Sequence, residues 1–116
     1  MPGSFFATFS EIKIEEEDQD KLVLSADGWL VAFDKHSQAV RYSGRLVASF
    51  RLVEAIDLEH FVNGKRYEWW ALSLKLRDGR TLKIGRSVDG AGVSIVAAHV
   101  ATITEKSVRS IDRVGF

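Results

Sequence analysis

Apolar and polar side chains alternate with a period of two along most of this chain, and this pattern constrains its fold more than any other feature. The alternating runs are short and are separated by turn-forming residues. The pairs Asp27-Gly28 and Asn63-Gly64 are typical of tight hairpins. The chain shows no internal repeat, and its single proline is Pro2. We therefore predict a continuous antiparallel meander of about seven strands.

An acidic stretch interrupts the meander near its beginning. Residues 5–14 alternate like a strand, but residues 15–20 read EEEDQD, with five acids in six positions. Carboxylates at this density have weak β propensity and are strongly hydrated. We therefore predict a solvated loop or turn over residues 15–20.

Only the C-terminal part of the chain changes to a helical period. Apolar residues recur there at spacings of three and four, namely Val93, Val96, Ala97, Val100 and Ile103. This stripe predicts an amphipathic helix that Ser87 or Asp89 caps at its start. Lys106 and Arg109 suit its C-terminal end, where cations interact favourably with the helix dipole.

These patterns together predict one domain that is mainly β with one C-terminal α-helix. The 116 residues suffice for a single hydrophobic core, which we place within about residues 7–109 of a domain spanning residues 1–116. No apolar run approaches the ~18 to 20 residues that span a bilayer. The N-terminus also lacks the basic segment of a signal peptide, so we expect a cytoplasmic protein.

The stretch RYEWWALSLKLRDGRTLKIGR, residues 66–86, is the most informative hairpin. Alternation places one apolar set on a common face, namely Trp70, Leu72, Leu74 and Leu76. Paired residues of a hairpin point the same way, so the loop must contain an odd number of residues. A loop of residues 77–79 sets Leu74 opposite Leu82 and Leu72 opposite Ile84. Trp70 is therefore predicted to belong to the core.

The other face of this hairpin is the candidate interaction surface. Its members are Tyr67, Trp69, Lys75, Lys83 and, near the edge, Arg86. Aromatic rings beside cations suit a protein partner, an anionic headgroup or stacked nucleic-acid bases. We rank a protein interface first, because aromatics and arginine are enriched at interface anchors. The structural alternative is that a loop or the N-terminal phenylalanines cover Trp69.

Charge is segregated along the chain although the net charge is zero. Residues 1–40 carry three basic and eight acidic side chains, a balance of −5; residues 41–116 carry thirteen and eight, a balance of +5. This split fits either two solvated faces or self-association, in which the acidic stretch of one copy meets basic strands of another. Specific nucleic-acid binding is not expected, because such proteins normally have a basic excess.

Residues that could support catalysis or metal binding are scattered. The histidines, His36, His60 and His99, lack the spacing and carboxylate context of a metal site, and there is no cysteine. The glycine-rich residues 85–92 lack the lysine of a P-loop, and residues 15–20 lack the glycine of a calcium loop. We predict no catalytic residues, no metal site and no cofactor, and a protein that is not an enzyme.

The order of these elements resembles the pleckstrin-homology-like (PH-like) domains of bacteria. The segment from FRLVEAIDLEHF through the DGR turn to SIVAAHVATI, residues 50–103, is similar to a long PH-like hairpin followed by its helix. The resemblance covers roughly residues 7–109. It implies a barrel of about seven antiparallel strands in two near-orthogonal sheets, closed by the helix, and a role in binding or assembly. Phosphoinositide binding is not implied, because acids occupy the place of the basic residues in the first hairpin.

Three functional hypotheses follow. The leading one is a binding or assembly module of bacterial PH-like type that binds a protein or copies of itself. The second is a peripheral binder of anionic lipid headgroups or phospho-ligands through Lys75, Lys83 and Arg86, with an anionic membrane ranked below a protein partner. The third is a small-ligand carrier that uses the barrel end near His60 and Arg80.

Overall fold

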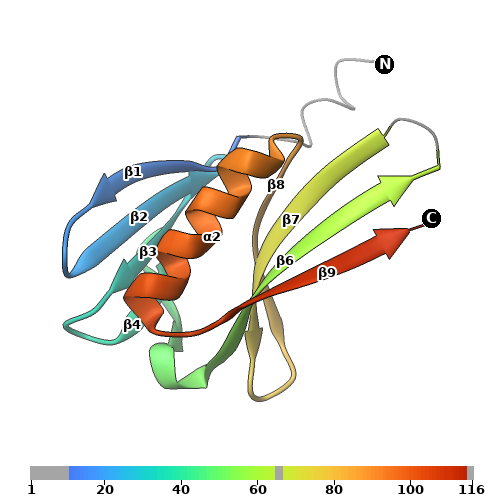
Figure 1. Ribbon diagram of the computed structural model, residues 1–116. Helices are drawn as coiled ribbons and strands as arrows, with labels where there is room; N and C mark the ends of the chain where they lie inside the picture. The colour runs from blue at the N-terminus through green and yellow to red at the C-terminus, as the bar shows by residue number, and fades with distance from the viewer. Residues whose placement is uncertain (1–10, 65–66, 115–116) are drawn as a thin grey trace.

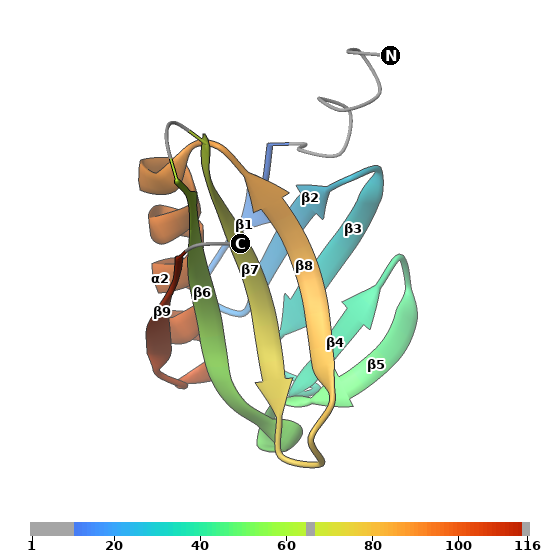
Figure 2. The same ribbon diagram turned by 90° about the vertical axis from the view of Figure 1, so that its right-hand side faces the viewer.

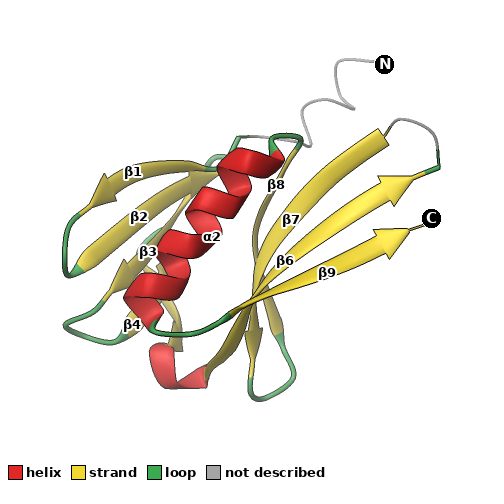
Figure 3. Cartoon of the chain, in the orientation of Figure 1, coloured by secondary structure: helices red, strands yellow, loops and turns green. Residues whose placement is uncertain are grey.

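The computed structural model describes residues 11–64 and 67–114 of the 116-residue chain. Over these residues the fold is mainly β, with two sheets and one α-helix close to the C-terminus (Figure 1, Figure 3). The prediction of a mainly β chain with a C-terminal helix is confirmed.

The first sheet is a meander of five antiparallel strands that lie side by side in chain order. They are β1 (Lys13–Glu17), β2 (Lys21–Ala26), β3 (Trp29–Asp34), β4 (Ala39–Tyr42) and β5 (Arg45–Ser49). Asp27-Gly28 joins β2 to β3 as predicted, with φ of 52° and 84° and with Ala26 opposite Trp29. Both residues therefore adopt the left-handed backbone that a two-residue hairpin turn needs.

The second sheet has the strand order β8-β7-β6-β9. Its members are β6 (Val53–Asn63), β7 (Tyr67–Leu76), β8 (Thr81–Ser87) and β9 (Val108–Val114), and a 3₁₀ turn, η1 (Phe50–Leu52), leads into it from β5. The β6-β7 and β7-β8 pairs are antiparallel, whereas β9 runs parallel to β6. The described residues thus form two separate sheets and not one closed barrel.

The described residues contain nine strands where about seven were predicted. The acidic stretch, predicted as a loop, is not wholly one, since residues 15–17 belong to β1. As an edge strand with outward-facing side chains, β1 keeps these carboxylates in water, and charge is common on such edges. The strand predicted over residues 5–14 is seen only from Lys13, and residues 5–10 lie outside the described part.

The last strand, β9, was not predicted. The helix α2 (Gly90–Thr104) ends earlier than expected, at Glu105, whose φ of 58° is left-handed. Arg109 therefore lies in β9 and not near the end of the helix. Strand β9 is mostly exposed and rich in charge, so it carries no clear alternation from which a strand could be predicted.

The core lies between the inner faces of the two sheets and α2, which packs against both (Figure 1). All five residues of the predicted apolar stripe of α2 are buried: Val93, Val96, Ala97, Val100 and Ile103. Asp89 caps the helix, because its Oδ1 accepts a hydrogen bond from the Gly92 nitrogen at 3.0 Å. No helix among the described residues has the length and hydropathy to cross a bilayer.

The β7-β8 hairpin has the predicted three-residue loop, and Gly79 there has a left-handed φ of 95°. Leu74 lies opposite Leu82 as predicted, but Leu72 lies opposite Gly85 and not Ile84. The cause is a β-bulge, which inserts Ile84 as an extra residue of β8. Beyond Lys83, the bulge shifts the alternation of β8 by one residue and so changes which of its side chains share a face.

Candidate binding site

The outer face of the second sheet, which points away from α2, carries the candidate site (Figure 2). Because β7 alternates regularly, its outward side chains stand in rows with those of its neighbours. Across these rows the pairs are Trp69 with Phe61, Ala71 with Glu59 and Arg86, and Ser73 with Asp57 and Lys83. Large side chains thus surround two small ones, Ala71 and Ser73.

This difference in size leaves a hollow of about 460 Å³ on the outer face. Ala71 and Ser73 line it, together with the aromatic pair Phe61 and Trp69. Trp29 also lines it, although it belongs to the β2-β3 hairpin of the first sheet. The volume falls in the range of pockets that accept a small molecule or a side chain, about 300 to 1,000 Å³.

Stacked rings form one wall of the hollow. The ring centroids of Phe61 and Trp69 are 3.9 Å apart, with an angle of 9° between the ring planes. The guanidinium carbon of Arg86 lies 5.6 Å from the centre of the Trp69 ring, within the range of a cation–π interaction. These contacts hold the Trp69 indole in a defined orientation.

Two hydrogen bonds attach the first sheet to β8 beside the hollow. The Trp29 Nε1 donates to the Ile84 carbonyl at 3.4 Å, and the Tyr42 hydroxyl donates to the Lys83 carbonyl at 2.7 Å. Both acceptors lie at the β-bulge, on the edge strand of the second sheet. The rings of Trp29 and Tyr42 also touch, at 5.7 Å between centroids. Burial raises the pKa of Tyr42, so its hydroxyl stays a donor.

Ser73 lines the hollow, and its buried hydroxyl lacks a hydrogen bond. The residue is 4% exposed, and its Oγ has almost no accessible surface and no hydrogen-bond partner among the described residues. The neighbouring carboxylate of Asp57 is engaged by Arg109, which donates to it at 2.8 Å and 3.0 Å. By contrast, Ser87 is equally buried but its Oγ accepts from the Asp89 nitrogen at 3.0 Å. Buried hydroxyls normally have a partner, so Ser73 needs an explanation.

The lining of the hollow carries charges of both signs. Of the described residues that line it, Asp27 and Glu59 are acidic, and Lys83 and Arg86 are basic. Glu59 is further neutralised by Arg113, whose Nε donates to it at 2.9 Å. The lining residues therefore carry two charges of each sign, and Arg113 beside them adds one cation.

The structure brings together part of the predicted interaction surface. Trp69, Lys83 and Arg86 all line the hollow, whereas Tyr67 and Lys75 lie on the same face of β7 but not among its lining residues. Tyr67 is 65% exposed, and the Lys75 Nζ donates to the Gly79 carbonyl at 3.2 Å. The N-terminal phenylalanines named as a possible cover lie outside the described residues.

Trp70 lies on the inner face, as predicted, but it is only half-buried. It packs at the margin of the core and stacks on His60, with ring centroids 4.6 Å apart and planes 5° apart. A Cβ at position 90 would lie 2.5 Å from the Trp70 ring, which explains the glycine at the start of α2. The adjacent tryptophans thus have separate roles, one in the hollow and one against the helix.

Sequence reasoning missed most of the lining residues, among them Trp29, Phe61, Ala71 and Ser73. A signal for two of them was available, because small residues at positions 71 and 73 interrupt the large outward side chains of the strand. The position of Phe61 could also have been predicted, because strand pairing across the Asn63-Gly64 turn places it near Trp69. The contribution of Trp29 could not be predicted, because its position depends on how the two sheets pack together.

The residues of the small-ligand hypothesis do not form a site. His60 is paired with Trp70 near one end of β7, whereas Arg80 lies beyond the other end, in the turn after Leu76. Arg80 donates to Asp78 at 2.9 Å, and the His60 Nε2 is 2.7 Å from Glu68. No group of three or more His, Cys, Asp or Glu side chains in the described part is arranged to hold a metal ion.

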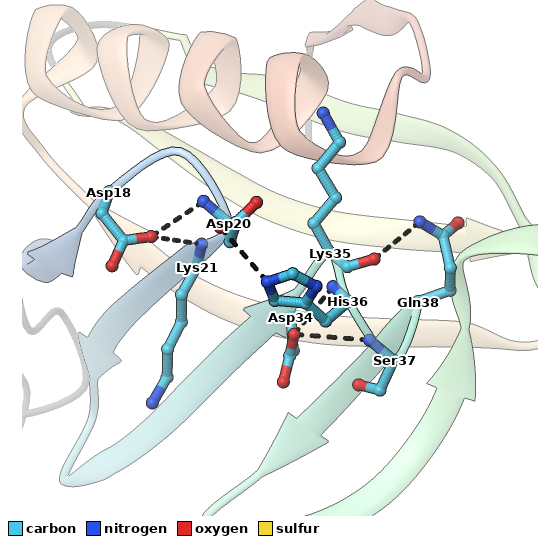
Figure 4. Close-up of polar contacts among 8 residues, drawn as sticks. All are labelled: Asp18, Asp20, Lys21, Asp34, Lys35, His36, Ser37 and Gln38. Atoms are coloured by element: carbon cyan, nitrogen blue, oxygen red, sulfur yellow. Dashed lines mark hydrogen bonds and ion pairs between the residues drawn. The ribbon is translucent and has the colours of Figure 1, made fainter.

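The acidic stretch makes contacts within the chain (Figure 4). The Asp18 Oδ1 accepts from the backbone nitrogens of Asp20 and Lys21 at 2.8 Å and 2.9 Å. Asp20 lies 3.2 Å from His36 of the β3-β4 turn, and Glu17 contacts His99 of α2. These exposed acids therefore already have partners that would compete with a second copy.

Comparisons of the chain with protein-family models, with curated proteins and with solved structures return no match.

Proposed function

We propose that this chain is a non-catalytic binding module that recognises a partner protein with the outer face of β6, β7 and β8. The aromatic hollow is the observation that carries the proposal. It offers a concave site of about 460 Å³ with Trp29, Trp69 and Arg86 on its lining. Tryptophan and arginine are the residues most enriched among the anchors of protein interfaces.

The surface around the hollow favours a protein over a small molecule. Tyr67 continues the aromatic face of β7 beyond the lining residues, and its side chain is largely exposed. Trp29 is 42% exposed on the opposite side. A small ligand would leave these rings in water, whereas a protein can cover the hollow and its surroundings together.

The balance of charge separates this proposal from anionic lipids and phospho-ligands. Those ligands need a cluster of cations, but the described lining has only two cations beside two acids. Lys75, the third cation of that hypothesis, is hydrogen-bonded to a backbone carbonyl and does not line the hollow. The relationship to bacterial PH-like domains stays a prediction, and the proposal does not depend on it.

The partner is tested by affinity capture with two matched variants. Trp69→Ala removes a wall of the hollow, and Leu46→Ala removes an exposed apolar side chain from the first sheet. We expect a protein captured by the wild type to be lost with Trp69→Ala and retained with Leu46→Ala. Equal capture by both variants would contradict the proposal.

Self-association through the acidic stretch is a special case, in which that stretch would exchange its partners within the chain for a second copy. Light scattering at low salt and at ~0.5 M salt tests it, because exposed ion pairs are screened at high ionic strength. If the acidic stretch of one copy binds the hollow of another, both salt and Trp69→Ala will dissociate the oligomer. A protein that stays monomeric at low salt and high concentration has a different partner.

A further inference from the structure

Strand β9 lies at one edge of the second sheet, and of the described strands only β6 pairs with it (Figure 1). Its register with β6 continues without a bulge from Val108 to Val114. The opposite edge, β8, differs because its carbonyls at Lys83 and Ile84 accept hydrogen bonds from side chains of the first sheet. A regular edge strand such as β9 can pair with an additional strand.

Alternate residues of β9 turn their backbone groups to this open edge. The Ile56 nitrogen donates to the Ser107 carbonyl at 2.9 Å, so Ser107 and every second residue after it face β6. The residues between them turn their N–H and C=O groups away from β6, namely Val108, Ser110, Asp112 and Val114. A strand on the far side of β9 would find these groups in position to pair.

The charged side chains of β9 do not block the edge, because each lies against a residue of β6. The pairs are Arg109 with Asp57, Arg113 with Glu59 and Asp112 with His60. Charges on an edge strand normally discourage the addition of a strand. Here they are directed back across the sheet, whereas the apolar Val108 and Val114 are exposed.

The sequence of β9 is nearly symmetrical about Ile111. Residues 108–114 read VRSIDRV, which is the same in both directions except at Ser110 and Asp112. An antiparallel second copy related by a twofold axis at Ile111 would therefore set Ile111 opposite Ile111, and Val108 opposite Val114. Twofold contacts of this kind are the commonest in soluble homo-oligomers.

We propose that two copies of this chain pair through their β9 strands, antiparallel and with Ile111 on the twofold axis, so that their second sheets form one continuous sheet. The inference goes beyond the proposed function, because it uses the edge at β9 and not the hollow.

The hydrogen-bonding pattern fits this register. The outward residues pair only with one another, Val108 with Val114 and Ser110 with Asp112, and each such pair exchanges two backbone hydrogen bonds. Ile111, whose backbone groups face β6, forms the non-hydrogen-bonded pair on the axis. A shift by one residue would set outward groups opposite inward ones, and a shift by two would no longer pair the valines.

The arginines oppose the pairing. Arg109 lies opposite Arg113 of the second copy, and like charges directly opposite each other are destabilising. Each guanidinium has a carboxylate of its own copy beside it, Asp57 or Glu59, which reduces this repulsion. Because the contact gains nothing from opposite charges, added salt should leave the dimer intact, in contrast to an oligomer formed by the acidic stretch.

Disulfide crosslinking tests the register, because the chain has no cysteine of its own. In Ile111→Cys the two thiols would face each other in a pair whose Cα atoms lie about 4.5 Å apart, close enough for a disulfide. Val114→Cys is the matched control, because Val114 is the more exposed residue but its two copies would lie about 20 Å apart, each opposite Val108. Under mild oxidation we expect Ile111→Cys to form a covalent dimer about tenfold faster than Val114→Cys.

Light scattering of a second matched pair tests the backbone hydrogen bonds. Ser110→Pro and Ser110→Ala both remove the hydroxyl, but only proline also removes an N–H that points to the open edge. The mass of the wild type and of Ser110→Ala should rise with concentration to that of a dimer, whereas Ser110→Pro should stay monomeric. Trp69→Ala should dimerise like the wild type.

Four results would overturn the inference: a wild type that stays monomeric, equal crosslinking of the two cysteine variants, dimers of Ser110→Pro, or a dimer that Trp69→Ala or salt dissociates. The first three leave the hollow as the candidate binding site, and the last assigns self-association to it. Should Ser110→Pro not fold, Ile111→Lys takes its place. It sets two ammonium groups opposite each other on the axis and must also prevent dimerisation.

Discussion

The hydroxyl of Tyr42 in β4 donates a 2.7 Å hydrogen bond to the backbone carbonyl of Lys83 in β8, and this contact joins the two sheets beside the hollow. Tyr42→Phe keeps the ring and removes only this bond. Because the Lys83 carbonyl loses a partner, we expect the free energy of unfolding to fall by about 1 kcal/mol in urea denaturation. An unchanged midpoint would show that the bond does not hold the sheets together.

The same tyrosine predicts a loss of stability at alkaline pH. Burial raises the pKa of Tyr42 in the folded state, whereas the unfolded tyrosine ionises at about pH 10. Above that pH the unfolded chain has released a proton that the folded chain retains, so stability falls as pH rises. The difference in unfolding free energy between wild type and Tyr42→Phe should therefore shrink above about pH 10. A difference that is constant with pH would contradict this.

Arg109 should stabilise the parallel strand β9 more than Arg113 does. Asp57 is buried, and Arg109→Ala would leave its carboxylate without two hydrogen bonds. We expect a loss of about 2 to 3 kcal/mol, the range for charged groups left unsatisfied. Arg113 binds the more exposed Glu59, so Arg113→Ala should cost less than about 1 kcal/mol. Denaturant midpoints of the two variants give the comparison, and equal losses would count against it.

Alanine substitutions at the two buried serines, Ser73 and Ser87, should have different effects on the stability of the protein. Ser87→Ala removes a partner of the Asp89 nitrogen at the start of α2 and should destabilise the protein by about 1 kcal/mol. Ser73→Ala removes a hydroxyl without a described partner, so stability should stay the same or rise. Thermal unfolding of both variants tests this pair. A destabilised Ser73→Ala would mean that the hydroxyl has a structural role.

The adjacent tryptophans should also differ. Trp70 packs against His60, Gly90 and the margin of the core, so Trp70→Ala should lose about 3 kcal/mol, the lower end for a large buried aromatic. Trp69 packs on the outer face, and Trp69→Ala should lose about 1 kcal/mol, less than a core truncation. Denaturation in urea compares the two variants directly. If Trp69→Ala were the more damaging change, the outer face would serve stability more than recognition.

Local patterns in the sequence predicted several features because their causes are local. The strict period of two in β7 separates Trp69 from Trp70, and the Asp27-Gly28 turn follows from its positive φ requirement. The cap at Asp89 follows from the chemistry of its side chain at the start of the apolar stripe.

The features that were missed depend on contacts between distant parts of the chain. Strand β9 is an exposed edge whose pairing with β6 uses Arg109 and Asp57, which are 52 residues apart. The bulge at Ile84 is stabilised by donors from Trp29 and Tyr42 of the other sheet. Neither contact leaves a periodic signal in the sequence. The hollow depends on both sheets, so only its wall at Trp69 and the cations of β8 could be named in advance.

Site-specific photocrosslinking tests the central claim, that the outer face of β6, β7 and β8 recognises a protein. A benzoyl-phenylalanine replaces Tyr67 beside the hollow, or Leu46 in the first sheet as a control of comparable exposure, 65% against 58%. The account predicts a discrete crosslinked product at position 67 that disappears when Trp69→Ala is added, and none at position 46. A product at position 46 alone, or one at position 67 that is unaffected by Trp69→Ala, would contradict it.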